Sequence, residues 1–155
     1  MIPIFHMRKL IILIFTLVLV SCNESQSYDT KSISEDLDII LFPISVTRFE
    51  AQKAKNELEK EGYKIGIANI VWLKPFKFMK EWENALKTSK FGGIVLDDDY
   101  ANGVASTFAY EIMKKTGKNI EIMGLNNKSA GFSKETDNLP PSFNKIIKEV
   151  KKICK

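Results

Sequence analysis

The feature that most limits the possible folds is a fourfold alternation of short apolar runs with longer amphipathic segments. The short runs have the length of strands, and the apolar residues of the longer segments recur at helical spacing. This alternation predicts an α/β fold, a three-layer α/β/α sandwich with a mostly parallel sheet of four to five strands. The expected strands are 38–42, 65–73, 93–96 and 120–123.

The first expected helix carries a capping pattern. Thr47 is followed three residues later by Glu50, as in a capping box. Phe49, Ala54 and Leu58 then recur at helical spacing and are expected to face the core.

The later expected helices are identified by stripes of apolar residues. Pro75 suits a first helical turn, so the second helix is expected to begin there. Such stripes are far more typical of a core than of a cofactor site. The three stripes are Phe78, Met79, Trp82 and Leu86, then Ala101, Ala105, Phe108 and Ile112, and finally Phe143, Ile146, Ile147, Val150 and Ile153.

The N-terminal residues have the parts of a secretory signal. Arg8 and Lys9 precede an apolar run over residues 10–20, which is shorter than the about twenty residues that span a bilayer. The sequence Leu19-Val20-Ser21-Cys22 resembles the lipobox of bacterial lipoproteins. This resemblance implies cleavage before Cys22 and lipidation of its thiol. A buried cysteine after a hydrophobic helix is the alternative.

The lipobox implies a location and a division of the chain. We expect a membrane-anchored lipoprotein of the bacterial cell envelope, with a signal peptide at 1–21, a lipidated tether at 22–27 and one α/β domain at 28–155. Translation begins at Met1 or at Met7, and the sequence leaves both open.

Cleavage of the signal peptide would change which reactive and charged residues the mature chain contains. His6 is the only histidine and leaves with the signal, so the mature chain would lack a Ser-His-Asp triad or a Cys/His zinc site. Cys154 would be the one free thiol, a partly buried structural group or one activated by nearby lysines. Loss of Arg8 and Lys9 leaves 21 Lys and Arg against 19 Asp and Glu, a net charge of +2. No nucleic-acid partner is expected.

Several stretches in order resemble the C-terminal domain of transketolase, which 2-oxoacid dehydrogenase beta subunits share. The chain departs from the family at Phe42-Pro43, where a Gly is usual, and at Asn102-Gly103, where two Gly are usual. The resemblance implies a five-stranded mixed sheet, with residues 31–33 as an extra strand. The similar stretches are 38–41, the helix from 47, 61–65, 72–76, 94–98 and 139–147.

In the thiamine diphosphate enzymes this domain supports assembly, and two other domains hold the cofactor. The resemblance therefore implies a non-catalytic binding or assembly module, with a homodimer or another protein as its partner and no cofactor in this chain. Phe76 and Tyr100 are candidate docking anchors, unless they belong to the core. An alternative is the C-terminal piece of a split enzyme, which would use thiamine diphosphate only with separate cofactor-binding domains.

A small-molecule or metal site is the remaining alternative. Parallel strands bring their carboxyl ends to one edge of a sheet, where ligands commonly bind. Acidic side chains there suit Mg²⁺ or Ca²⁺, or a general acid with a raised pKa, although Asp98 or Asp99 would also cap the following helix. The candidate ligand-binding residues are Asp97, Asp98 and Asp99 after the third strand, and Ser45, Thr47 and Arg48 after the first.

Overall fold

The computed structural model describes residues 36–129 and 137–155, which belong to one compact unit of the chain. The signal peptide expected at 1–21, Cys22 with its tether, and the extra strand expected at 31–33 lie outside the described residues.

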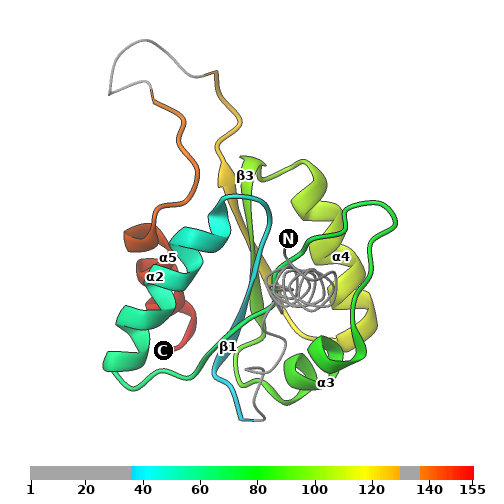
Figure 1. The fold of residues 1–155 in the computed structure, drawn as a ribbon, viewed down its shortest axis with the longest axis vertical. Coiled ribbons are helices and arrows are strands. Elements are labelled where there is room, and N and C mark those ends of the chain that lie inside the picture. Colours follow the sequence, from blue (N-terminus) through cyan, green and yellow to red (C-terminus); the bar gives the residue numbers. More distant parts are fainter. Residues whose placement is uncertain (1–35, 130–136) are drawn as a thin grey trace, which may run out of the picture. The chain divides into compact units, whose positions relative to one another are not determined.

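The described sheet has four parallel strands in the order β2-β1-β3-β4 (Figure 1). The strands are β1 (Ile39–Pro43), β2 (Ile65–Ile67), β3 (Gly93–Tyr100) and β4 (Ile120–Leu125). Every residue of β1 is buried, which is why the sequence of this central strand is a continuous apolar run. The predicted α/β class and the four-stranded parallel sheet are confirmed.

Four described helices cover the two faces of the sheet. Because neighbouring side chains of a strand point to opposite faces, Ile39 and Leu41 pack in the core under one pair of helices, and Ile40 and Phe42 pack under the other. The first pair is α2 (Thr47–Lys60) and α5 (Phe143–Ile153), and the second is α3 (Lys80–Thr88) and α4 (Val104–Thr116) (Figure 1). The predicted three-layer sandwich is confirmed.

An aromatic cluster fills the core under α3 and α4. Phe76 stacks on Phe108 with ring centroids 4.3 Å apart, and Phe78 lies 6.1 Å from both Phe42 and Trp82. Phe76 is thus a packed residue rather than an exposed docking anchor, as the core alternative held.

Two helix starts differ from the prediction. Helix α3 begins at Lys80, so Pro75, Phe78 and Met79 precede it and are not part of its apolar stripe. Phe78 and Met79 still pack against the core from the preceding loop. Helix α4 begins at Val104, which leaves Ala101 in the turn before it.

The second strand is shorter than predicted. It ends at Ile67, and a single further bridge pairs Ile44 with Ile70. Val71 and Leu73, expected to continue the strand, are exposed.

The prediction that Phe49 faces the core from α2 is wrong. Ala54 and Leu58 are buried as predicted, but 56% of Phe49 is exposed. Thr47 and Ala51 are the buried positions at the start of the helix, and Phe49, two residues from each at about 100° per residue, points to the opposite side.

Candidate functional site at the carboxyl edge of the sheet

The two groups of candidate residues meet where the strand order reverses. From β1 the chain continues to β2 on one side, whereas β3 continues to β4 on the other, so the switch point lies between β1 and β3. The N–H of Ile44 donates to the carbonyl of Leu96 at 2.8 Å across this point. The sequence therefore predicted correctly that these two segments adjoin.

Thr47 holds the switch point together. Its hydroxyl lies 2.6 Å from the carbonyl oxygen of Ile44 and 3.1 Å from that of Leu96, and it accepts from the N–H of Ile44 at 3.1 Å. Thr47 is buried and makes no capping bond to the helix that follows. The predicted capping box is wrong, because the hydroxyl joins the segment after β1 to strand β3, and Val46 takes the N-cap position.

Ser45 and Arg48 point away from this network. Ser45 is exposed and has a positive φ of 54°, which lets the chain turn sharply between strand and helix. Arg48 is exposed, and its guanidinium lies over the neighbouring Phe49 ring, with Cζ 4.7 Å from the centroid. Among the described residues, neither side chain forms a hydrogen bond with another of the candidate ligand-binding residues.

Asp97 is the most unusual of the three acidic residues. Only 2% of it is exposed, and its Oδ1 accepts from the N–H of Asp99 at 3.2 Å. Its Oδ2 is buried without a hydrogen-bond partner in the part of the chain that the structure describes. Burial, followed by the nearby charges of Asp98 and Asp99, raises the pKa of Asp97 above its ordinary value.

Asp98 and Asp99 do not cap helix α4 as expected. The helix has Gly103 at its N-cap position without a side-chain cap, and Asp99 Oδ1 instead accepts from the N–H of Tyr100 at 2.7 Å. Between residues 36 and 129 and from 137 onward, no three carboxylate, thiol or imidazole groups are close enough to share a metal ion.

A hollow of about 530 Å³ adjoins the carboxyl end of β4, and sequence reasoning missed it. Asn138 fixes one side: its amide nitrogen donates to the carbonyls of Asn126 and Lys128, and its Oδ1 accepts from the N–H of Asn126. The walls include Asn102 and Lys145, so amide groups and one cation face the space. These residues are far apart in sequence and no local motif connects them.

An exposed apolar run, Val71-Trp72-Leu73, lies in the loop after β2. Trp72 is 62% exposed, and Lys77 Nζ lies 5.4 Å from the centre of its ring. The sequence pattern suggested a continuing strand here, so this surface was also missed. Tyr100, the other expected anchor, is partly exposed, and its hydroxyl donates to the carbonyl of Lys128 at 3.3 Å.

No helix within the described residues has both the length and the apolar character needed to cross a membrane.

Comparisons with known proteins place the fold. No protein-family model and no curated protein sequence matches the chain. A solved structure described as "Split gene transketolase, inactive beta4 tetramer" is similar, with a TM-score of 0.59 and 17% sequence identity. The match covers 76% of this chain and 38% of that one, so this chain spans well under half the length of its neighbour. At the level of the fold, the expected resemblance to a transketolase domain is supported.

Proposed function

We propose that this chain is an envelope lipoprotein, anchored through Cys22, whose single domain binds or assembles with protein and has no catalytic activity of its own. The observation that carries the binding role is the exposed run Val71-Trp72-Leu73. Single exposed apolar residues are ordinary on protein surfaces, but adjacent large ones are typical of interaction sites.

Trp72 is the expected centre of the binding surface. A tryptophan buries roughly 150–250 Å² when it is covered, and tryptophan is enriched among residues that dominate binding energy. The ammonium group of Lys77 lies over the Trp72 ring, but much of the Trp72 side chain remains exposed to solvent. A partner would therefore gain apolar burial at Trp72 without first unfolding the loop.

Two further observations support assembly without catalysis. The structural neighbour is described as an inactive tetramer, so a longer chain that contains this fold can assemble without activity. At the switch point of this chain, the hydroxyl of Thr47 is committed to hydrogen bonds with the backbone carbonyls of Ile44 and Leu96.

The anchor is tested by the intact mass of the protein isolated from bacterial membranes. We expect a mass that lacks residues 1–21 and includes acyl chains, and we expect Cys22→Ala to abolish both changes. An unprocessed chain without lipid would overturn the lipoprotein assignment.

The binding surface is tested by a photo-crosslinking residue placed at Trp72 in living cells. Tyr110 is the matched control, because it is also an exposed aromatic, 58% accessible, with Lys114 Nζ 6.0 Å from its ring centre. We expect a crosslinked product from position 72 and none from position 110, with mass spectrometry showing a second copy or another protein. Equal products or none would contradict a role for Val71-Trp72-Leu73.

The second candidate function is one piece of a split thiamine diphosphate enzyme. It is favoured by the structural neighbour, which is described as a split-gene transketolase. In that case the chain would be recovered from the cytosol with its signal intact, bound to a second chain and to thiamine diphosphate. Fluorometric assay of the cofactor in the purified complex distinguishes this candidate from the lipoprotein, for which no cofactor is expected.

A further inference from the structure

Helix α5 carries a one-sided row of lysines. At about 100° per residue, the four lysines of the helix fall within about 120° of its circumference, opposite the buried Ile146 and Val150, and Lys155 follows just after the helix ends. Glu149 is the only acidic residue between 143 and 155. The lysines of this surface, which we call the α5 lysine face, are Lys145, Lys148, Lys151, Lys152 and Lys155.

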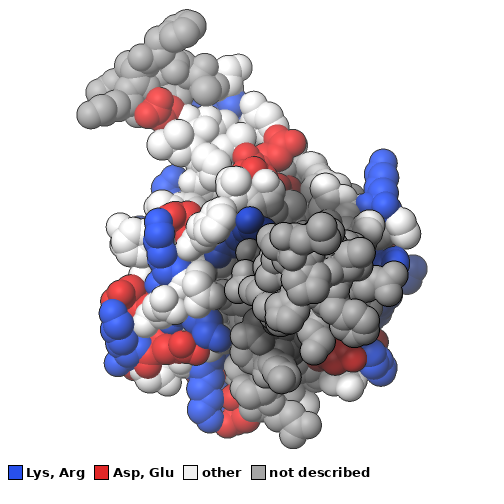
Figure 2. Space-filling model, in the orientation of Figure 1, with Lys and Arg blue, Asp and Glu red and all other residues white. Residues whose placement is uncertain are grey.

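Only part of this charge is neutralised within the described residues. Lys151 pairs with Glu61 at 2.6 Å, and Lys152 pairs with Glu149 at 2.8 Å. The other three lysines of the face form no ion pair with any described residue. Helix α2 differs, because basic and acidic groups are interleaved over its outer side in Figure 2 and pair within the helix.

The α5 lysine face also has an apolar floor. Ile147 and the stems of Lys148, Lys151 and Lys152 line a shallow hollow of about 550 Å³. Lysine stems cover apolar surface while their ammonium groups reach outward. The face therefore offers cations above apolar groups, which complements phospholipid headgroups above their acyl chains.

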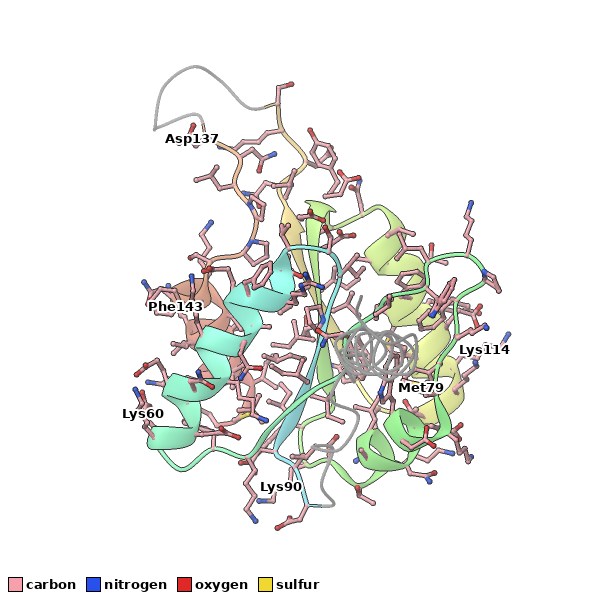
Figure 3. All side chains as sticks on the ribbon, in the orientation of Figure 1. Lys60, Met79, Lys90, Lys114, Asp137 and Phe143 are labelled. Carbon is pink, nitrogen blue, oxygen red and sulfur yellow. The ribbon has the colours of Figure 1, made fainter. Side chains whose placement is uncertain are left out.

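The C-terminal end of α5 lies where the described chain begins. Cys154 lines the same hollow as Asp38 and Lys90, and Lys90 Nζ lies 2.8 Å from Asp38 Oδ1. Figure 3 labels Lys90 at this end of the domain, near the point where the described ribbon begins. The chain from Cys22 to Asp36, when fully extended, reaches at most about 50 Å. A lipid on Cys22 would therefore hold this end of the domain within reach of the bilayer.

We propose that the α5 lysine face rests on anionic phospholipid headgroups and sets the orientation of the domain on its membrane. The inference rests on the proposed lipid anchor, which keeps the face close to the bilayer. Each lysine near an anionic leaflet strengthens attachment about fivefold, and the anchor adds to this effect. A membrane is favoured over nucleic acid because the lining residues include no aromatic side chain for base stacking.

The test measures the distance between α5 and the bilayer in the mature lipidated protein. A fluorophore is attached at Asn144→Cys, which preserves all five lysines, in a Cys154→Ser background. The matched probe is Thr107→Cys, an exposed residue of α4 on the opposite layer. The vesicles contain phosphatidylglycerol or only phosphatidylcholine, and both carry a headgroup-linked quencher.

We expect quenching at 144 to be at least twice that at 107 in phosphatidylglycerol vesicles, and the difference to disappear in phosphatidylcholine or at high salt. Lys148→Gln with Lys155→Gln is expected to abolish the difference, whereas Lys114→Gln with Lys115→Gln on α4 is expected to preserve it. Equal quenching at both probes in anionic vesicles would overturn the proposal, as would capture of the face by DNA in place of vesicles.

The proposed lipid anchor and the proposed membrane contact of the α5 lysine face are tested by separate measurements. The intact mass of each preparation shows whether lipid is present, independently of α5. If lipid is absent, the anchor fails, and sedimentation of the same chain with the two kinds of vesicle still tests α5. Preferential sedimentation with phosphatidylglycerol would support the lysine face, and equal sedimentation would overturn it.

Discussion

The backbone N–H of Phe143 donates a hydrogen bond of 2.9 Å to Oε2 of Glu50, 93 residues away in sequence. Phe143 is the first residue of α5, which has no cap from its own N-cap residue. A carboxylate from the first turn of α2 thus satisfies one of the free N–H groups at the start of α5. This bond joins the two helices that cover one face of the sheet.

Glu50→Ala is expected to lower the free energy of unfolding by about 1 kcal/mol, the usual cost of losing a helix cap. Glu57→Ala is the control, because the partner of Glu57 among the described residues is Lys60 on the outside of the same helix, and such surface pairs contribute little. Urea unfolding followed by circular dichroism measures both. Equal losses would show that the bond to Phe143 adds nothing to stability.

The same bond predicts a pH dependence. Hydrogen bonds from Lys53 and from the N–H of Phe143 lower the pKa of Glu50 below its ordinary value of 4.5. A carboxyl with a lowered pKa in the folded state stabilises the protein above the unfolded pKa and loses that effect as the pH falls through the folded pKa. The difference between wild type and Glu50→Ala is therefore expected to be full at pH 7 and to shrink below about pH 4.5.

Thr47→Val tests the junction at the switch point. The substitution keeps the shape of the side chain but removes the hydroxyl that bonds the carbonyls of Ile44 and Leu96. Because the site is buried, we expect a loss of about 1–2 kcal/mol in the free energy of unfolding. Thr88→Val is the control, since its hydroxyl bonds Ala85 within its own helix. A loss at Thr47 no larger than at Thr88 would contradict a structural role for the junction.

The comparison of Thr47 with Leu41 shows why sequence predicts some features and misses others. Leu41 belongs to a continuous apolar run, and such a run has few alternatives to a buried central strand. Thr47 and Glu50 have the local pattern of a capping box, but both bond residues distant in sequence. Tertiary partners of this kind compete with local caps, and a single sequence does not display them.

The candidate site was predicted in position but not in geometry. Alternation of strands and helices was enough to place Asp97 and Thr47 at the same edge of the sheet. The burial of Asp97 depends on packing from other segments, which the sequence does not specify. Trp72 was missed for a related reason, because the residues around it have strand-like alternation although the pairing ends at Ile70.

Asp97→Asn is expected to stabilise the protein at neutral pH. The pKa of Asp97 is raised mainly by burial, so the folded state holds the proton more tightly than the unfolded chain. The free energy of unfolding therefore falls as the pH rises from the pKa of Asp97 in the unfolded chain to its pKa in the folded protein. Above the folded pKa the carboxyl is charged in both states, and the full loss of stability applies. The substitution retains an oxygen for the N–H of Asp99 and removes the charge.

We expect a gain at pH 7, because the substitution removes a charge from a buried position, and little gain below pH 4, where the wild-type carboxyl is itself neutral in the folded protein. Asp99→Asn is the control, since it removes an exposed neighbouring charge and is expected to give a smaller gain. Thermal unfolding over a range of pH measures both variants. A gain at Asp97 that does not change with pH would contradict the raised pKa.

Cys154 is expected to react slowly with alkylating reagents. Burial raises the pKa of its thiol from 9.0 to about 11, and the nearby carboxylate of Asp38 acts in the same direction. At pH 8 the thiolate fraction then falls from about a tenth to about a thousandth, and the thiolate is the reacting form. We expect iodoacetamide to modify Cys154 at least about tenfold more slowly in the folded protein than in urea, as measured by the mass of the C-terminal peptide over time. Equal rates in the folded protein and in urea would show an accessible, ionised thiol and would support the activated cysteine that the neighbouring lysines suggested.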